Sequence, residues 1–179
     1  MERNAESCLW LILLVQYLFY LALLSQLNYT LSSHSLFLFI NGGFITFPAL
    51  FFPFGHGLTA TLLFSLFYDA GESWALGTSL IPSLIAFVAV YQIRDRISFN
   101  KNGVQCGLIL LVNLGLYLYY MALAAIHLPL TLTMMLLTLV HLLFSQIFLA
   151  FLSGWIVALQ KSAFQFFRID VDSLTLPAK

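Results

Sequence analysis

Long apolar runs almost without charged residues constrain the fold of this sequence more than any other feature. Hydrophobic residues make up 61% of the 179 residues and charged residues only 8%, against about 25% charged residues in an average soluble domain. A helix needs about 20 predominantly apolar residues to cross the hydrocarbon core of a bilayer. Runs of this kind fill nearly the whole chain, so the sequence predicts a single membrane domain over 1–179 with no soluble domain beside it.

Short breaks divide the apolar sequence into a predicted all-α bundle of six transmembrane helices. A tight turn at Pro53, Gly55 and Gly57 separates the second span from the third, because proline removes a backbone donor and glycine frees the backbone. The third span is short for a full crossing, so it must be tilted, be extended through Phe54, or end below the surface. The spans are expected at about 8–27, 36–52, 55–69, 74–93, 104–126 and 130–160, followed by a short cytoplasmic tail over 161–179.

Two spans contain residues that interrupt a regular helix. The Asn-Gly-Gly stretch at 41–43 predicts a kink or a close helix approach at membrane depth. Pro82 lies inside the fourth span and is compatible with two arrangements. Either Ser79 caps a shorter helix that begins there, or the helix begins near Ser73 and kinks at the proline.

Polar side chains on the last two spans lie on single helical faces. Asn113 and Tyr117 share one face of the fifth span, and His141 and Ser145 share one face of the sixth. Polar side chains on apolar helices are typical of faces that form interhelical hydrogen bonds. These faces are therefore expected to point into the bundle.

The basic residues predict the orientation in the membrane. With six spans and a cytoplasmic N-terminus, every Lys and Arg falls on the cytoplasmic side, as the positive-inside rule requires. The C-terminus is then cytoplasmic as well, and the loop after Asp69 faces outward. The basic residues are Arg3, Arg94, Arg96, Lys101, Lys161, Arg168 and Lys179.

Several function classes are disfavoured by the pattern of reactive residues. The net charge is zero and the basic residues are scattered, which argues against a nucleic-acid partner. Cys8 and Cys106 form neither a disulfide framework nor a metal-ligand spacing. The sequence has no phosphate loop and no hydrolase or metalloprotease motif. We therefore expect no catalytic residue, no cofactor and no enzymatic activity.

Four histidines are too widely spread to predict a metal site, since three lie at loop or span ends on both sides of the expected membrane. His141 is alone on an apolar helix, where a hydrogen bond to a neighbouring span is expected. The others are His34, His56 and His127.

Asp69 and Glu72 are the only carboxylates between Glu6 and Asp95. An acid/base pair or a cation site is one interpretation, because two carboxylates three residues apart can approach each other. The other interpretation is that they are solvated loop charges or mark a hydrogen-bonded helix end, and this interpretation is favoured. Since Asp69 follows an apolar run, we expect it to be buried between helices and bonded to backbone amides of the loop that follows.

The stretch from Gly55 to Arg96 resembles the rod shape-determining protein MreD family, small bacterial inner-membrane proteins. The shared pattern is a glycine turn, a short span ending in aspartate, a small-residue loop, a Leu-Gly pair and a span with a basic end. Pro82 and the residues at 72–74 depart from the family pattern, in which smaller residues are usual in this loop. The matching residues are Gly55, Gly57, Asp69, Gly71, Leu76, Gly77, Arg94 and Arg96.

The resemblance implies a multi-pass inner-membrane subunit of the cell-elongation complex that is not an enzyme. It would bind an MreC-like protein and, through it, MreB-like filaments and peptidoglycan synthases, with the matching residues as structural or partner-binding candidates. The layout is also similar to the substrate-binding membrane subunits of energy-coupling-factor vitamin transporters. In that alternative a small molecule binds at the outer loop, with Trp74 stacking and Asp69 hydrogen bonding.

Overall fold

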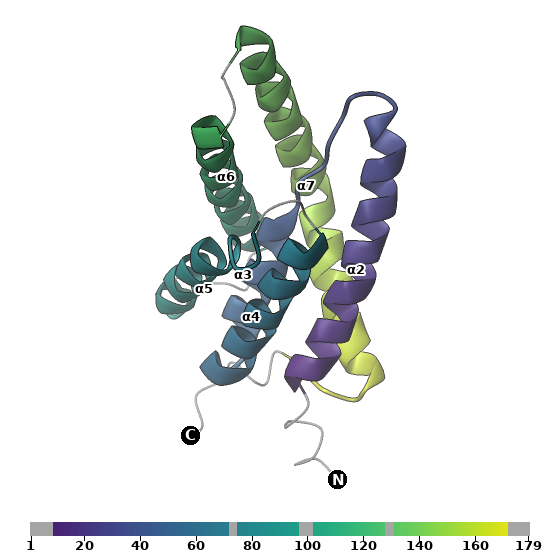
Figure 1. Cartoon of the computed structure of the whole chain (residues 1–179). Helices are drawn as coiled ribbons and strands as arrows, with labels where there is room; N and C mark the ends of the chain where they lie inside the picture. The colour runs from purple at the N-terminus through teal and green to yellow at the C-terminus, as the bar shows by residue number, and fades with distance from the viewer. Residues whose placement is uncertain (1–8, 72–74, 97–101, 128–130, 172–179) are drawn as a thin grey trace.

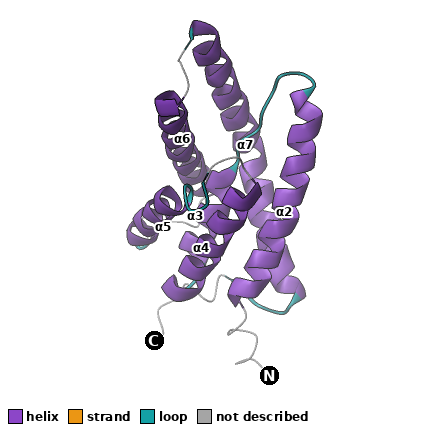
Figure 2. Cartoon of the chain, in the orientation of Figure 1, coloured by secondary structure: helices purple, strands orange, loops and turns teal. Residues whose placement is uncertain are grey.

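The computed structural model describes residues 9–71, 75–96, 102–127 and 131–171, and within them all regular structure is helical (Figures 1 and 2). The all-α prediction is confirmed for this part of the chain. The helices are α2 (Leu9–Ser32), α3 (Asn41–Phe51), α4 (Phe54–Gly71), α5 (Leu80–Arg94), α6 (Asn102–His127) and α7 (Leu132–Phe166).

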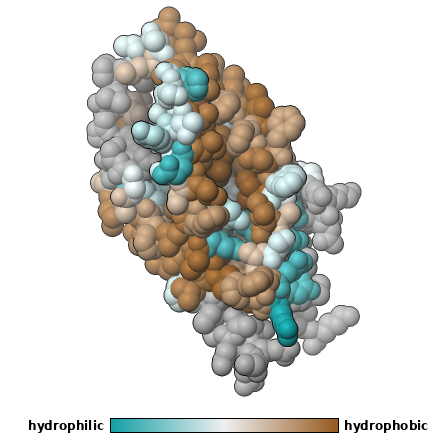
Figure 3. All heavy atoms as spheres, turned by 90° about the vertical axis from the view of Figure 1, so that its right-hand side faces the viewer, coloured by the Kyte–Doolittle hydropathy of each residue, from teal (hydrophilic) through white to brown (hydrophobic). Residues whose placement is uncertain are grey.

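Three of these helices are long and apolar enough to cross a membrane. They are α2, the Gly103–Ile126 part of α6, and α7, which has 35 residues. Hydrophobic residues cover most of the face seen in Figure 3, and hydrophilic atoms gather mainly towards its two ends. These features suggest a membrane protein. They do not establish six crossings, because α3 has 11 residues and α5 has 15, fewer than the roughly 20 that a full crossing needs.

The prediction of one helical span over 36–52 is wrong. Residues 36–40 form no regular structure, and only Asn41–Phe51 is helical. We call residues 36–39 the extended segment. At 1.5 Å per residue, α3 is about 16 Å long, roughly half the thickness of a bilayer core. The chain returns from the end of α2 to the middle of the bundle before α3 begins (Figure 1).

Side chains from three helices make the extended segment possible by satisfying its backbone. Asn28 of α2 donates to Leu38 O at 3.0 Å and accepts from Leu38 N–H at 2.8 Å. Phe39 N–H donates to Ser145 Oγ of α7 at 2.9 Å, and Phe39 O accepts from Asn113 Nδ2 of α6 at 2.9 Å. Non-helical backbone at membrane depth is tolerated only where such groups are satisfied within the protein.

Helix α3 is the centre of the bundle, since all of its residues are buried and it packs against α4, α5, α6 and α7. It approaches α6 closely at Gly42. A Cβ atom at Gly42 would lie 2.5 Å from Ile109 O and 2.6 Å from Asn113 N. Gly42 N–H also donates to Asn113 Oδ1 at 3.0 Å. The expected close approach at 41–43 is therefore confirmed, and only glycine fits at 42 without movement of the backbone.

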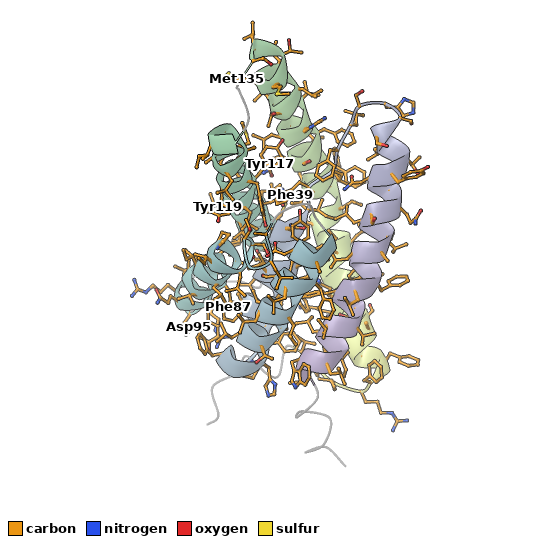
Figure 4. All side chains as sticks on the ribbon, in the orientation of Figure 1. Phe39, Phe87, Asp95, Tyr117, Tyr119 and Met135 are labelled. Carbon is orange, nitrogen blue, oxygen red and sulfur yellow. The ribbon has the colours of Figure 1, made fainter. Side chains whose placement is uncertain are left out.

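The polar faces predicted on the last two spans point inward. Tyr117 donates to Thr138 O of α7 at 2.9 Å, and its ring packs edge-on against Phe39 at 5.6 Å (Figure 4). His141 Nε2 lies 2.9 Å from Ser35 O. Gly42 N–H of α3 donates to Asn113, so interhelical hydrogen bonding is confirmed for the face of α6. On α7, His141 and Ser145 instead bond the non-helical chain between α2 and α3, at Ser35 and Phe39.

The fourth span begins at Leu80, later than the predicted residue 74. Ser79 occupies the N-cap position, but its hydroxyl makes no capping bond. Pro82 falls in the first turn of the helix, where backbone N–H groups have no partner within the helix. The N–H that proline lacks therefore costs no helical hydrogen bond. The shorter helix, rather than the kinked one, is therefore the arrangement that forms.

Other helix boundaries also differ from those expected. Helix α4 begins at Phe54, so the third span is extended through that residue. Helix α2 continues to Ser32 rather than ending at 27, since the amide of Asn28 bonds the returning chain from within the helix. Helix α7 continues to Phe166, into the region expected as a tail.

Two basic side chains gather at the C-terminal end of α3. Arg94 donates to Phe52 O at 2.9 Å, and Lys161 Nζ lies 4.4 Å from the ring centre of Phe51. Helix α2 begins and α7 ends at one end of the bundle (Figure 1). This arrangement agrees with termini on a shared side, while the side of the membrane that they occupy stays a prediction.

Candidate functional site

Asp69 closes the hairpin formed by α4 and α5. It lies near the end of α4 with 2% of its surface exposed. Its Oδ2 accepts from Gly77 N–H at 2.8 Å and from Ser79 N–H at 3.0 Å, and Oδ1 lies 3.1 Å from the same Ser79 nitrogen. A buried carboxyl group is stable only when such donors replace water. The expected burial and bonding to the following loop are both confirmed.

A second hydrogen bond joins the two arms of the hairpin at the same end. The Ser79 hydroxyl donates to Ser65 O of α4 at 2.9 Å. This bond explains why the hydroxyl does not cap α5. Tyr119 of α6 donates to Thr78 O at 3.1 Å, so the turn is also held against the next helix.

The turn itself requires glycine at one position. Gly77 has φ +95°, a left-handed conformation that favours glycine because it has no Cβ. The neighbouring Leu76 is 71% exposed. A Cβ at Gly71, the last residue of α4, would meet nothing within 4 Å. Gly77 therefore shapes the turn, whereas Leu76 and Gly71 lie on the surface.

Gly57 permits close packing near the other end of the hairpin. A Cβ there would lie 2.8 Å from Phe87 Cε2 of α5 and 2.9 Å from Pro48 O of α3. Phe87 lies between α4 and α5 (Figure 4). Gly55, two residues earlier, is exposed and has open space around its Cα. The two glycines of the predicted turn thus have different environments.

Arg94 fastens the end of α5 to the chain between α3 and α4. Besides its bond to Phe52 O, it donates to Tyr91 Oη at 3.0 Å, and its guanidinium carbon lies 3.8 Å from the centre of the Tyr91 ring. It also contacts Asp95 at 3.4 Å. Arg96 is exposed beyond the end of the helix.

The structure therefore separates the residues of the MreD resemblance into two groups. The locking residues, which hold the hairpin in place, are Gly57, Asp69, Gly77 and Arg94. The exposed residues lie at the ends of the hairpin and are Gly55, Gly71, Leu76 and Arg96. All eight come together on α4, α5 and their connections.

An apolar groove runs along this hairpin between α5 and α6. Its volume is about 340 Å³. Small residues form part of its floor, among them Ala86, Ala89 and Gly115, and such residues allow a further helix to approach closely in a membrane. The sequence alone does not reveal this groove, because α5 and α6 are both apolar and nothing in their spacing shows how far apart they lie.

Metal-ligating residues do not converge in the described parts of the chain, where no group of three or more His, Cys, Asp or Glu residues is found. Cys106 is a free thiol in those ranges, whereas Cys8 lies outside them. Glu72 and Trp74 also lie outside the described residues, so the predicted carboxylate pair and the stacking role of Trp74 stay predictions.

Comparisons with protein families, with curated proteins and with solved structures find no match for this chain. The function of the hairpin is therefore inferred from its own residues and their contacts.

Proposed function

We propose that this chain is a non-enzymatic, MreD-like membrane subunit that assembles the cell-elongation machinery in a bacterial inner membrane. It binds an MreC-like protein and, through it, MreB-like filaments and peptidoglycan synthases. The observation that carries the proposal is the gathering of all eight matching residues on one hairpin. Four of them lock its geometry, and four are exposed at its ends, where a partner can reach them.

The locking residues give the hairpin the rigidity that a docking element needs. Hydrogen bonds that Asp69 accepts and Ser79 donates fix one end. At the other, Arg94 fixes the end of α5, and Gly57 lets α4 pack directly on Phe87. A preorganised surface loses little conformational entropy on binding, which favours stable association.

The groove between α5 and α6 is the binding place for the membrane-spanning helix of the MreC-like partner. It is apolar along its length and contains small residues, which suits a helix that packs by van der Waals contact within lipid. Arg96 is exposed past the end of α5, beside this groove, and can contact polar residues that flank the partner helix.

The test is affinity purification of the tagged full-length chain from its native membrane after mild crosslinking, with partners identified by mass spectrometry. An MreC-like protein, MreB-like filament proteins or peptidoglycan synthases are expected in the eluate. Ala89→Trp, which fills the groove, should reduce recovery of the MreC-like protein at least several-fold. Asp95→Ala is the matched control on the same helix, since Asp95 is exposed and does not line the groove.

Recovery of paired ATPases with a coupling subunit would overturn the proposal in favour of the vitamin-transporter alternative. The geometry at Asp69 weighs against the substrate-bonding role that this alternative gives to Asp69. Its carboxyl oxygens are buried and accept backbone N–H groups, so they are not free to bond a substrate.

A further inference from the structure

A hydrogen bond joins the two walls of the groove between α5 and α6 just past one end of its lining. The first groove residue of α5 is Pro82, and the last groove residues of α6 are Gly115 and Leu116. Thr78 lies four residues before Pro82 in the chain. Tyr119 lies four residues after Gly115, about one helical turn further along α6. The Tyr119 hydroxyl donates to Thr78 O at 3.1 Å (Figure 4), and this bond connects the start of α5 to α6.

Pro82 explains why the carbonyl oxygen of Thr78 takes its donor from outside α5. In an α-helix each carbonyl oxygen accepts from the N–H four residues later. For Thr78 that residue is Pro82, which has no N–H. The next bond of the series does form, since Ser83 N–H donates to Ser79 O at 3.0 Å. Tyr119 therefore supplies a donor that α5 itself cannot provide.

The ring of Tyr119 is held from within the core. It packs edge-on against Tyr120, with 5.5 Å between the ring centres. Tyr120 in turn packs edge-on against Phe39 at 5.7 Å. Phe39 is buried, and its backbone is bonded by side chains of α6 and α7. Aromatic packing of this kind fixes the direction in which the Tyr119 hydroxyl points.

Other hydrogen bonds at the start of α5 hold it to α4 rather than to α6. Asp69 of α4 accepts from the N–H groups of Gly77 and Ser79. The Ser79 hydroxyl donates to Ser65 O, also of α4. Helix α5 packs more extensively against α3 and α4 than against α6. If the bond from Tyr119 is lost, we therefore expect the start of α5 to stay with α4 and to move away from α6.

We propose that Tyr119 is a positioning residue, which holds the start of α5 at the distance from α6 that the partner helix requires. This inference rests on the proposed function, in which the groove binds the membrane-spanning helix of an MreC-like protein. A helix in lipid associates largely by van der Waals contact. A gap of about 0.5–1 Å loses about a quarter to a half of the attraction between two atoms. A partner helix that contacts both walls is therefore sensitive to a small displacement of α5.

The first measurement is the distance between spin labels on the two walls, by electron paramagnetic resonance of purified full-length protein in lipid nanodiscs. The labels are attached at Ile81→Cys and Leu118→Cys, in a protein whose Cys8 and Cys106 are replaced by serine. Both labelled positions are exposed, and neither lines the groove. Tyr119→Phe removes only the hydroxyl and should increase the mean distance by about 2 Å, a displacement typical of helices at an interface.

Tyr117→Phe is the matched control on the same helix. Tyr117 donates to Thr138 O of α7 at 2.9 Å and does not line the groove. The control therefore removes a hydrogen bond of the same kind that joins α6 to a different helix. It should leave the distance between the labels unchanged. If the Tyr119 hydroxyl only added general stability, the two variants would change this distance alike.

The second measurement is recovery of the MreC-like protein from the native membrane, by the same crosslinking and affinity purification. Tyr119→Phe should lower the recovery about three-fold relative to Tyr117→Phe, because part of the binding free energy is then used to restore the groove. An unchanged label distance in a folded Tyr119→Phe protein would overturn the positioning role, and so would undiminished recovery of the partner. Failure of the original chain to recover an MreC-like protein would overturn the proposed function, whereas the label distance separately decides whether Tyr119 positions α5.

Discussion

Replacing Asp69 by alanine should destabilise the fold, because a half-buried and a buried backbone donor would lose their acceptor. These are the N–H groups of Gly77 and Ser79, at 2.8 and 3.0 Å from Oδ2. An unsatisfied buried donor costs about 1–3 kcal/mol and water can reach the half-buried one, so Asp69→Ala should lower the free energy of unfolding by about 1–4 kcal/mol. Asp69→Asn keeps one oxygen as an acceptor and should lose about half as much.

The assay is reversible unfolding of the purified protein in mixed micelles, followed by circular dichroism as denaturing detergent is added. Asp95→Ala is the matched control in the same hairpin, since Asp95 is 83% exposed and pairs with its neighbour Arg94 at 3.4 Å. Asp95→Ala should change the free energy of unfolding by less than about 0.5 kcal/mol. The reasoning would be refuted if Asp69→Ala lost no more than this control, because the carboxyl group would then contribute nothing to closing the hairpin.

Three further changes test other contacts of the structure. Gly42→Ala should cost about 1–3 kcal/mol in the same unfolding assay, because its Cβ would lie 2.5 Å from a backbone oxygen of α6; Gly43→Ala, with its nearest atom at 3.5 Å, should be close to neutral. Asn113→Leu leaves Phe39 O and Gly42 N–H unpaired and should cost about 2–6 kcal/mol, and a smaller loss would show that water replaces the amide. Changing Arg94 and Arg96 together to Glu should disturb the orientation, and an unchanged reporter-tag topology map would contradict the predicted cytoplasmic side.

Local composition accounts for what the sequence predicted correctly. Long charge-poor runs indicate helices in a membrane because no other open structure satisfies its backbone there. Helical periodicity placed Asn113 and Ser145 on inward faces, since polar side chains in apolar helices seek partners on neighbouring helices. Asp69 was predicted to bond the following loop because that loop supplies the nearest backbone donors in the sequence. Each of these predictions depends only on residues close together in the chain.

The signal for the environment of α3 was present but incomplete in the sequence. The Asn-Gly-Gly stretch at 41–43 indicated an irregularity at membrane depth, and the structure confirms a close approach at Gly42. That Asn41 would be left with an unpaired oxygen depends on which side chains surround it. Residues of α2, α4 and the segment 37–39 line a pocket together with Asn41, so no local pattern contains these surroundings.

By itself, then, the sequence determined an apolar helical protein, its polar faces and the closure of the hairpin at Asp69. The tertiary structure alone decided that 36–40 is not helical and that α3 is a short buried helix. Leu38 and Phe39 are as apolar as residues of a spanning helix, so hydropathy does not distinguish the two conformations. The extended form is possible because Asn113 and Ser145, 74 and 106 residues away from Phe39, supply the hydrogen bonds that a helix would have made within itself.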